Sequence, residues 1–220
     1  MKGIWWKALT AILVMYTVIF GLLSGVPRLP ILHETIRNLY FHVPMWWTMI
    51  FLFLLSFVYS IKYLATSDIN YHEAASEAVN TGLAFGLLGI CTGMIWARFT
   101  WGDFWTNDVQ LNGAAITILT YTAYVILKNS IDDELKKARF TAVYSIFAFV
   151  LMIVFIGILP RLTDSLHPGK GGNPGFNQYD LDSQMRMVFY PAVIGWLLTG
   201  YWIYRIKLRL ARVNKKTFDL

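Results

Sequence analysis

Residues 38–61, NLYFHVPMWWTMIFLFLLSFVYSI, form a run of 24 residues without Asp, Glu, Lys or Arg. A helix of this length rises about 36 Å, enough to cross a hydrocarbon core about 30 Å thick. Five further charge-free runs of 18 to 21 residues cover 8–27, 78–97, 109–127, 140–160 and 187–204. Six such runs in one short chain predict six membrane-spanning helices.

The composition favours the same class of protein. Of the 220 residues, 56% are hydrophobic and only 15% are charged, whereas soluble domains carry about 25% charged residues. This excludes an ordinary soluble enzyme and a disordered chain, and the single Cys91 excludes a disulfide scaffold. Open sheets cannot satisfy their edges in lipid. We therefore predict an all-α polytopic membrane protein, with residues 1–220 forming one six-helix domain.

The distribution of Lys and Arg predicts the orientation. With six spans, both termini lie on one side, together with 13 of the 19 Lys and Arg residues. The positive-inside rule then places both termini in the cytoplasm. The basic C-terminal tail favours anionic lipid rather than nucleic acid. Residues 65–77 and 128–139 are expected to be solvated linkers on that side, or short helices supported by i,i+4 charge pairs. His72, in the first of them, is expected to be solvated.

The opposite, outer side carries three of the four histidines: His33, His42 and His167. It also carries residues 98–108, RFTWGDFWTND. If this stretch is a helix along the membrane surface, Arg98, Trp101, Trp105 and Asp108 share one face. Two indoles one turn apart would make a flat platform, and Gly102 would let a planar ligand approach. The alternative interpretation is an interfacial belt of aromatic residues.

Two outer histidines flanking an aromatic platform, with cations nearby, match the needs of haem. Haem iron takes axial imidazole, and propionates favour Arg or Lys. Zinc is the weaker alternative because it needs a third or fourth ligand. Residues 169–175, GKGGNPG, do not fit the phosphate-binding G-x-x-x-x-G-K-[ST] pattern, so no ATPase site is expected in this chain.

With these motifs, HVPMWW at residues 42–47, WGDFWTND at 101–108 and the outer His167, the chain resembles the haem exporter protein C (CcmC) family of cytochrome c maturation. The resemblance covers nearly the whole chain. It implies a tryptophan-rich "WWD" haem-handling segment at about residues 98–112, between the third and fourth spans. It also implies that His42 and His167 are axial ligands of a transiently and non-covalently bound haem b. Trp101, Gly102, Trp105 and Asp108 would belong to the haem platform.

The resemblance further implies a haem carrier rather than an enzyme, in a bacterial inner membrane with the haem site on the periplasmic side. Such a carrier delivers haem to the chaperone CcmE and works with the ABC subunits CcmA and CcmB and with small CcmD. The chain departs from the family segment at Asn107, Gln110 and Asn112, which stand where a Trp, an Arg and a Thr are usual. Arg98, Arg161 or Arg186 would then supply the cation for the propionates.

Three alternatives remain at this stage. The first is a cytochrome c haem lyase or synthase of the same WWD group, although no second histidine pair lies within the spans. The second is a membrane electron-transfer cytochrome that keeps a bis-histidine haem in place. The third is a haem-free scaffold whose outer aromatic residues only anchor it in the membrane.

Overall fold

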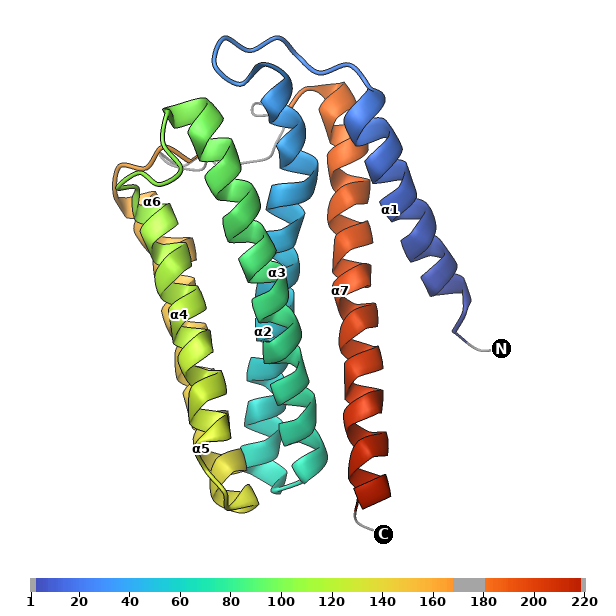
Figure 1. Cartoon of the computed structure of the whole chain (residues 1–220), viewed down its shortest axis with the longest axis vertical. Helices are drawn as coiled ribbons and strands as arrows, with labels where there is room; N and C mark the ends of the chain where they lie inside the picture. Colours follow the sequence, from blue (N-terminus) through green and yellow to red (C-terminus); the bar gives the residue numbers. More distant parts are fainter. Residues whose placement is uncertain (1–2, 168–180, 219–220) are drawn as a thin grey trace.

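The structure, a computed structural model, describes residues 3–167 and 181–218, which form a bundle of long helices without a strand (Figure 1). In chain order the elements are α1 (Trp5–Leu23), the 3-10 helix η1 (His33–Asn38), α2 (Leu39–Thr66), α3 (Ile69–Trp101), α4 (Val109–Asn129), α5 (Glu134–Met152), the π-helix η2 (Ile153–Ile158), α6 (Leu159–Leu162) and α7 (Ser183–Phe218). Among the described residues, six helical stretches are long and apolar enough to cross a membrane. The predicted all-α, six-span fold is therefore confirmed.

The helices extend beyond the charge-free runs. The prediction that residues 65–77 form a solvated linker is therefore wrong, since most of them belong to α3. Only Ser67 and Asp68 separate α2 from α3. Ser67 adopts a left-handed conformation (φ 55°), and Asp68 caps α3 by accepting a hydrogen bond from the Asn70 N–H. His72 lies in the first turn of α3 and is buried, with its ring 6.0 Å from that of Tyr63. A helix does not end where its first charge appears, because it can continue into water once it leaves the bilayer.

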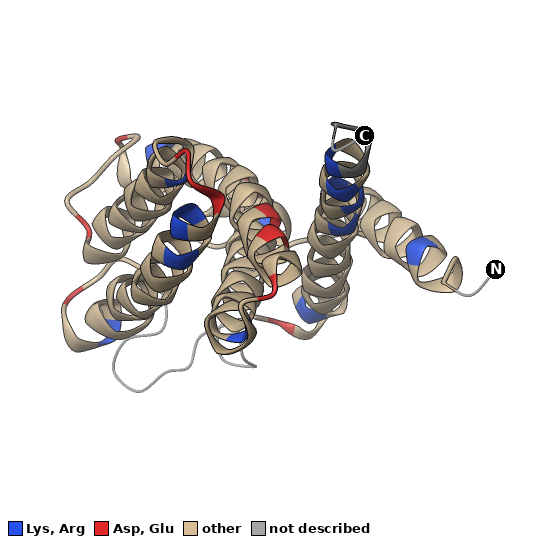
Figure 2. Cartoon of the chain, turned by 90° about the horizontal axis from the view of Figure 1, so that it is seen from below, with Lys and Arg blue, Asp and Glu red and all other residues tan. Residues whose placement is uncertain are grey.

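The charged ends of these long helices bind one another. Glu77 on α3 lies 3.6 Å from Lys207 on α7, and Glu73 lies 2.9 Å from Lys215. Figure 2, which views the bundle from this end, shows acidic positions among the basic ones. Exposed ion pairs contribute little stability individually, but these fix how α7 lies along α3.

Glycines on α3 bring it into close contact with α2. At each, an added Cβ would lie within 3 Å of a large side chain of α2. The four pairs are Gly82 with Phe53, Gly86 with Met49, Gly89 with Trp46 and Gly93 with His42. Small residues at a helix interface let the backbones approach closely, which is how helices associate in lipid. The last pair shows that this interface also seats one of the predicted ligands.

A π-helical segment places the end of the fifth span beside the start of α4. Pro160 has no N–H and cannot continue the α-helical ladder to residue 156, and the π-helix η2 lies just before it. Gly113 on α4 lies so close that an added Cβ would be 2.4 Å from the Phe155 carbonyl oxygen. This contact brings residues 163–167, which follow α6, over the N-terminus of α4.

Gly86→Leu should destabilise the bundle. The new Cβ would lie 2.3 Å from Ile118 Cδ1 and 2.7 Å from Met49 Sδ, and overpacking of this kind costs about 1–3 kcal/mol. Ala84→Leu is the matched control because Ala84 is exposed on the same helix. Thermal unfolding in detergent should show a lower midpoint for Gly86→Leu only. Equal midpoints for both variants would contradict the close α2–α3 contact.

Candidate functional site

Asp108 is the centre of a hydrogen-bond network at the end of the bundle that carries His33, His42 and His167, called the histidine end below. As the N-cap of α4, its Oδ1 accepts from the backbone N–H groups of Gln110 and Leu111, at 2.9 and 3.2 Å. Its Oδ2 accepts from the Ser165 hydroxyl at 2.9 Å and from the Leu166 N–H at 2.7 Å. One carboxylate, only 3% exposed, thus joins the start of α4 to the connection that follows α6.

These contacts favour the charged form of Asp108. Burial by itself raises the pKa of this carboxyl group, but the hydrogen bonds from His167, the Leu166 N–H and Ser165 outweigh it and hold the pKa below its usual range. A carboxylate with several donors is stabilised as the anion. Asp108 therefore carries a fixed negative charge inside the site at neutral pH.

His167 is oriented by this carboxylate. Its Nδ1 lies 3.0 Å from Asp108 Oδ1, and its ring meets the Trp101 indole edge-on at a centroid distance of 5.0 Å. Because a carboxylate only accepts, Nδ1 carries the proton of this bond. A neutral imidazole held in this way presents Nε2 as a metal ligand, with the carboxylate as the outer partner that metal-binding histidines usually have.

His42 is oriented in the same way by the backbone of α3. Its Nδ1 lies 3.1 Å from the Gly89 carbonyl oxygen and 3.1 Å from Thr92 Oγ1. The carbonyl can only accept, so Nδ1 carries the proton and the Nε2 lone pair is left available. Trp46 and Trp96 each meet the ring edge-on, at 6.2 and 5.8 Å. His42 therefore sits in a rigid helix interface, although it is not paired with a charge.

The predicted surface helix over residues 98–108 is wrong. Helix α3 continues through Trp101 and ends at Gly102, whose φ of 91° strongly favours glycine. Residues 103–107 are not helical, and α4 begins after Asp108. Arg98 donates to the Gly102 carbonyl and lies over the Phe104 ring at 5.9 Å. The four residues expected on one face are therefore divided between a helix end, a loop and a helix cap.

Trp105 lies in that loop and is held by two of the residues that depart from the family pattern. Its Nε1 donates to Asn112 Oδ1 at 3.2 Å, and Asn112 Nδ2 donates to Asn107 Oδ1 at 2.9 Å. Trp105 is 40% exposed. The two asparagines thus fix the indole without burying it, a role that could not be read from the residue types alone.

The structure brings Trp101, Asp108 and His167 into one contact network, with Arg98 and Gly102 at the adjoining helix end. An added Cβ on Gly102 would have no neighbour within 4 Å, so the space above this turn is open to a ligand. His42 is on a separate wall, formed by the interface of α2 and α3. Within the described parts of the chain, no three His, Cys, Asp or Glu side chains are placed to hold a metal ion together.

Fold and site together define a class: a multi-pass helical membrane protein with two imidazoles toward one end of the bundle, each bonded through Nδ1 to an oxygen. Two axial imidazoles are a ligand set that haem iron accepts. Residues 2–219 match the sequence model of the family described as CcmC, "Heme exporter protein C". The chain belongs to this family.

Individual relatives agree with this assignment. A protein of Bradyrhizobium diazoefficiens named "Heme exporter protein C" is 30% identical over 112 residues, which are 51% of this chain and 43% of the relative. A "Putative cytochrome c biosynthesis ccmC-like mitochondrial protein" of Arabidopsis thaliana is 31% identical over 85 residues, 39% of this chain and 33% of the relative. The "Cytochrome c biogenesis protein CcsA" of Cuscuta reflexa is 28% identical over 104 residues, 47% and 33% of the two chains. Each match spans less than half of the relative's length.

Asp108→Asn should weaken the histidine end of the bundle at neutral pH. The variant keeps the shape of the side chain but loses its charge, and a hydrogen bond to a charged group contributes about 1.5–3 kcal/mol. The pKa of Asp108 is lowered in the folded protein. The greater stability of the wild type is therefore fully present above the unfolded-state pKa of about 3.9. It is lost as the pH falls further.

The measurement is thermal unfolding of both proteins from pH 7 to pH 3. The difference between their midpoints should stay constant down to about pH 5 and shrink below about pH 4. If the difference between the two midpoints stays the same from pH 7 to pH 3, the charge of Asp108 does not contribute to stability.

Proposed function

We propose that this chain holds haem at the histidine end of the bundle and passes it on during cytochrome c maturation. The observation that carries the proposal is that His42 and His167 are hydrogen-bonded in the same way. Each has its Nδ1 bonded to an oxygen acceptor, which leaves Nε2 for iron. Family membership supports the choice of haem as the cargo.

In this proposal the haem is haem b, bound without a covalent link. Its iron would be bound by Nε2 of His42 and of His167, and its ring would pack near Trp101 and Trp105. The open turn at Gly102 leaves room for the edge of the ring. Arg98, at the same turn, is the cation best placed for a propionate.

The two ligands differ in how firmly they are held, which suits a carrier. His42 is 9% exposed and packs against the glycines of α3, whereas His167 follows α6 in a non-helical connection and is held mainly through Asp108. Handing over a ligand requires a second state with lower affinity for it. We propose that the His167–iron bond breaks first, while His42 keeps the haem in place.

The acceptor of the haem would be CcmE, and the ABC subunits CcmA and CcmB, together with CcmD, would be the other partners. The site would face the periplasm and both termini the cytoplasm of a bacterial inner membrane. The excess of Lys and Arg on the side of the termini supports this orientation. The chain would act as a carrier without enzymatic activity.

A haem lyase of the same group is the second candidate, and the relatives named "Cytochrome c biogenesis protein CcsA" favour it. The two functions separate when the chain is expressed without partners beside an apocytochrome c. A lyase attaches haem to the apocytochrome, whereas a carrier gives up its haem only to an acceptor such as CcmE. A membrane cytochrome would release haem to neither.

The absorption spectrum of the haem-loaded protein tests the ligands. The wild type should show a low-spin bis-imidazole haem. His167→Ala should keep haem in a high-spin form with one imidazole, because His42 still holds the iron. His42→Ala should lose most of the haem, since it removes the more rigid ligand.

His33→Asn is the control for these variants. His33 lies at the same end, is exposed and has a φ of 42°, which Asn tolerates better than most residues. Its spectrum should match the wild type. If both ligand variants kept the low-spin spectrum, the assignment of His42 and His167 would be wrong.

Asn112→Ala should lower haem affinity because it removes the acceptor of the Trp105 indole N–H. Residues that orient a binding group typically contribute 10- to 100-fold to metal affinity, and a loss at the lower end, of about tenfold, is expected for an exposed ring. Haem titration measures the effect. Gln110→Ala is the control, because the Gln110 contact with Asp108 is made by its backbone N–H. Equal affinities of the two variants would exclude a role for the asparagine pair.

A further inference from the structure

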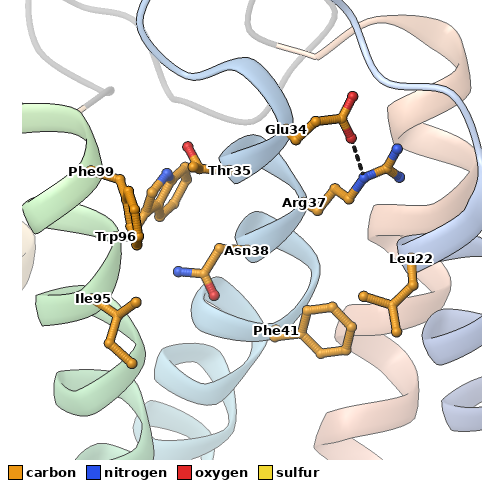
Figure 3. A pocket seen from close by; sticks show the side chains of 9 residues that line it. All are labelled: Leu22, Glu34, Thr35, Arg37, Asn38, Phe41, Ile95, Trp96 and Phe99. Atoms are coloured by element: carbon orange, nitrogen blue, oxygen red, sulfur yellow. Dashed lines mark hydrogen bonds and ion pairs between the residues drawn. The ribbon is translucent and has the colours of Figure 1, made fainter.

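A groove at the same end of the bundle is lined by the end of α1, by η1 and the start of α2, and by the end of α3 (Figure 3). It adjoins the proposed haem site, because Trp96 lines the groove and also packs against His42. Its volume is about 310 Å³. The apolar walls are formed by Leu22, Phe41, Ile95 and Phe99. Three of these, Leu22, Ile95 and Phe99, are more than half exposed and belong to stretches apolar enough to span a membrane. The groove therefore opens toward lipid rather than toward the histidines.

The mouth of the groove carries one charge of each sign. Arg37 binds Glu34 with an Nε–Oε2 distance of 2.7 Å, and its Nη1 donates to the carbonyl oxygens of Gly21 and Ser24 at the end of α1. The Glu34 side chain is 73% exposed. The Arg37 guanidinium is thus already bonded to three oxygen atoms, whereas the Glu34 carboxylate remains largely exposed.

The wall of the groove also contains a donor without an acceptor. Trp96 lines the groove, and its Nε1 is shielded from solvent and has no hydrogen-bond partner. A buried N–H without an acceptor is unfavourable. An occupant that brings an acceptor oxygen to Trp96 would remove this cost.

We propose that this groove binds one zwitterionic phospholipid with a primary ammonium group, phosphatidylethanolamine. An acyl chain would lie along the apolar walls, an ester carbonyl oxygen would accept from Trp96 Nε1, and the ammonium group would bind the Glu34 carboxylate. A porphyrin with two propionates fits less well, because Glu34 would repel them and Arg37 is already paired. The lipid would hold α1 against α3 beside the wall that positions His42.

Native mass spectrometry of the full chain tests this site without any haem. The protein is purified in detergent and supplied with equal amounts of phosphatidylethanolamine and phosphatidylglycerol of identical acyl chains. One phosphatidylethanolamine should remain bound per chain. Glu34→Gln should lower the preference over phosphatidylglycerol at least fivefold, and Trp96→Phe should lower the retained fraction. Trp47→Phe is the control for the latter, because Trp47 is an exposed indole outside the groove.

Filling the groove gives a second, independent readout. Ile95→Trp should abolish retention of the lipid, whereas Leu88→Trp should not, since Leu88 is equally exposed on α3 but does not line the groove. Elution as a single sharp peak in size-exclusion chromatography verifies that each variant is folded. Equal retention of both lipids by the wild type, retention by Ile95→Trp, or recovery of a porphyrin or a peptide instead of a lipid would each overturn the proposal. The haem spectra of His42 and His167 variants do not depend on these results.

Discussion

The close contact between α2 and α3 is the constraint on which both the bundle and the site depend. Between Gly82 and Gly93 each turn of α3 carries a glycine, and each of these glycines receives a large side chain of α2. In lipid no hydrophobic force drives helices together, so this surface complementarity has to hold the pair. His42 is the last of these side chains, and its Nδ1 is bonded to a backbone carbonyl of the same helix face. The geometry that closes the bundle thus also sets the orientation of one ligand.

His167, the second proposed ligand, is held by a carboxylate rather than by a helix interface. Asp108 caps α4, accepts from Ser165 and Leu166, and binds His167 Nδ1. Its charge is stabilised by every one of these donors, so helix start, connection and imidazole are ordered together. The π-helical turn before Pro160 contributes by bringing α6 beside α4. If His42 and His167 are the ligands, as proposed, one lies in a close-packed helix interface and the other in a polar network, so the site could loosen at His167 alone.

The number of spans, and the end of the bundle at which each histidine lies, could be predicted from the sequence because both follow from long apolar runs. The helix ends could not, since α2 and α3 continue past the charge-free runs and His72 is buried in α3 beside Tyr63. The spacing of Arg98, Trp101, Trp105 and Asp108 was misleading. Gly102 is a helix-ending signal, and Asp108 before an apolar run is a helix-starting signal; both outweigh the periodicity. The glycines of α3 are visible in the sequence, but the side chains of α2 that they receive are not. The pairing of Asp108 with His167 spans 59 residues, and no local pattern predicts such a contact.

In the proposed haem platform, the residues that depart from the expected pattern would change how the platform is built rather than remove it. Where an indole is usual, Asn107 is linked through Asn112 to Trp105, so an amide pair orients the remaining tryptophan. Trp101 instead packs against the ring of His167. Displacing His167 from the iron would therefore disturb Trp101 directly, whereas Trp105 would stay in place through its asparagines. In the proposed carrier, haem would leave His167 and Trp101 together while His42 and Trp105 still hold it, so release would begin at one edge of the ring.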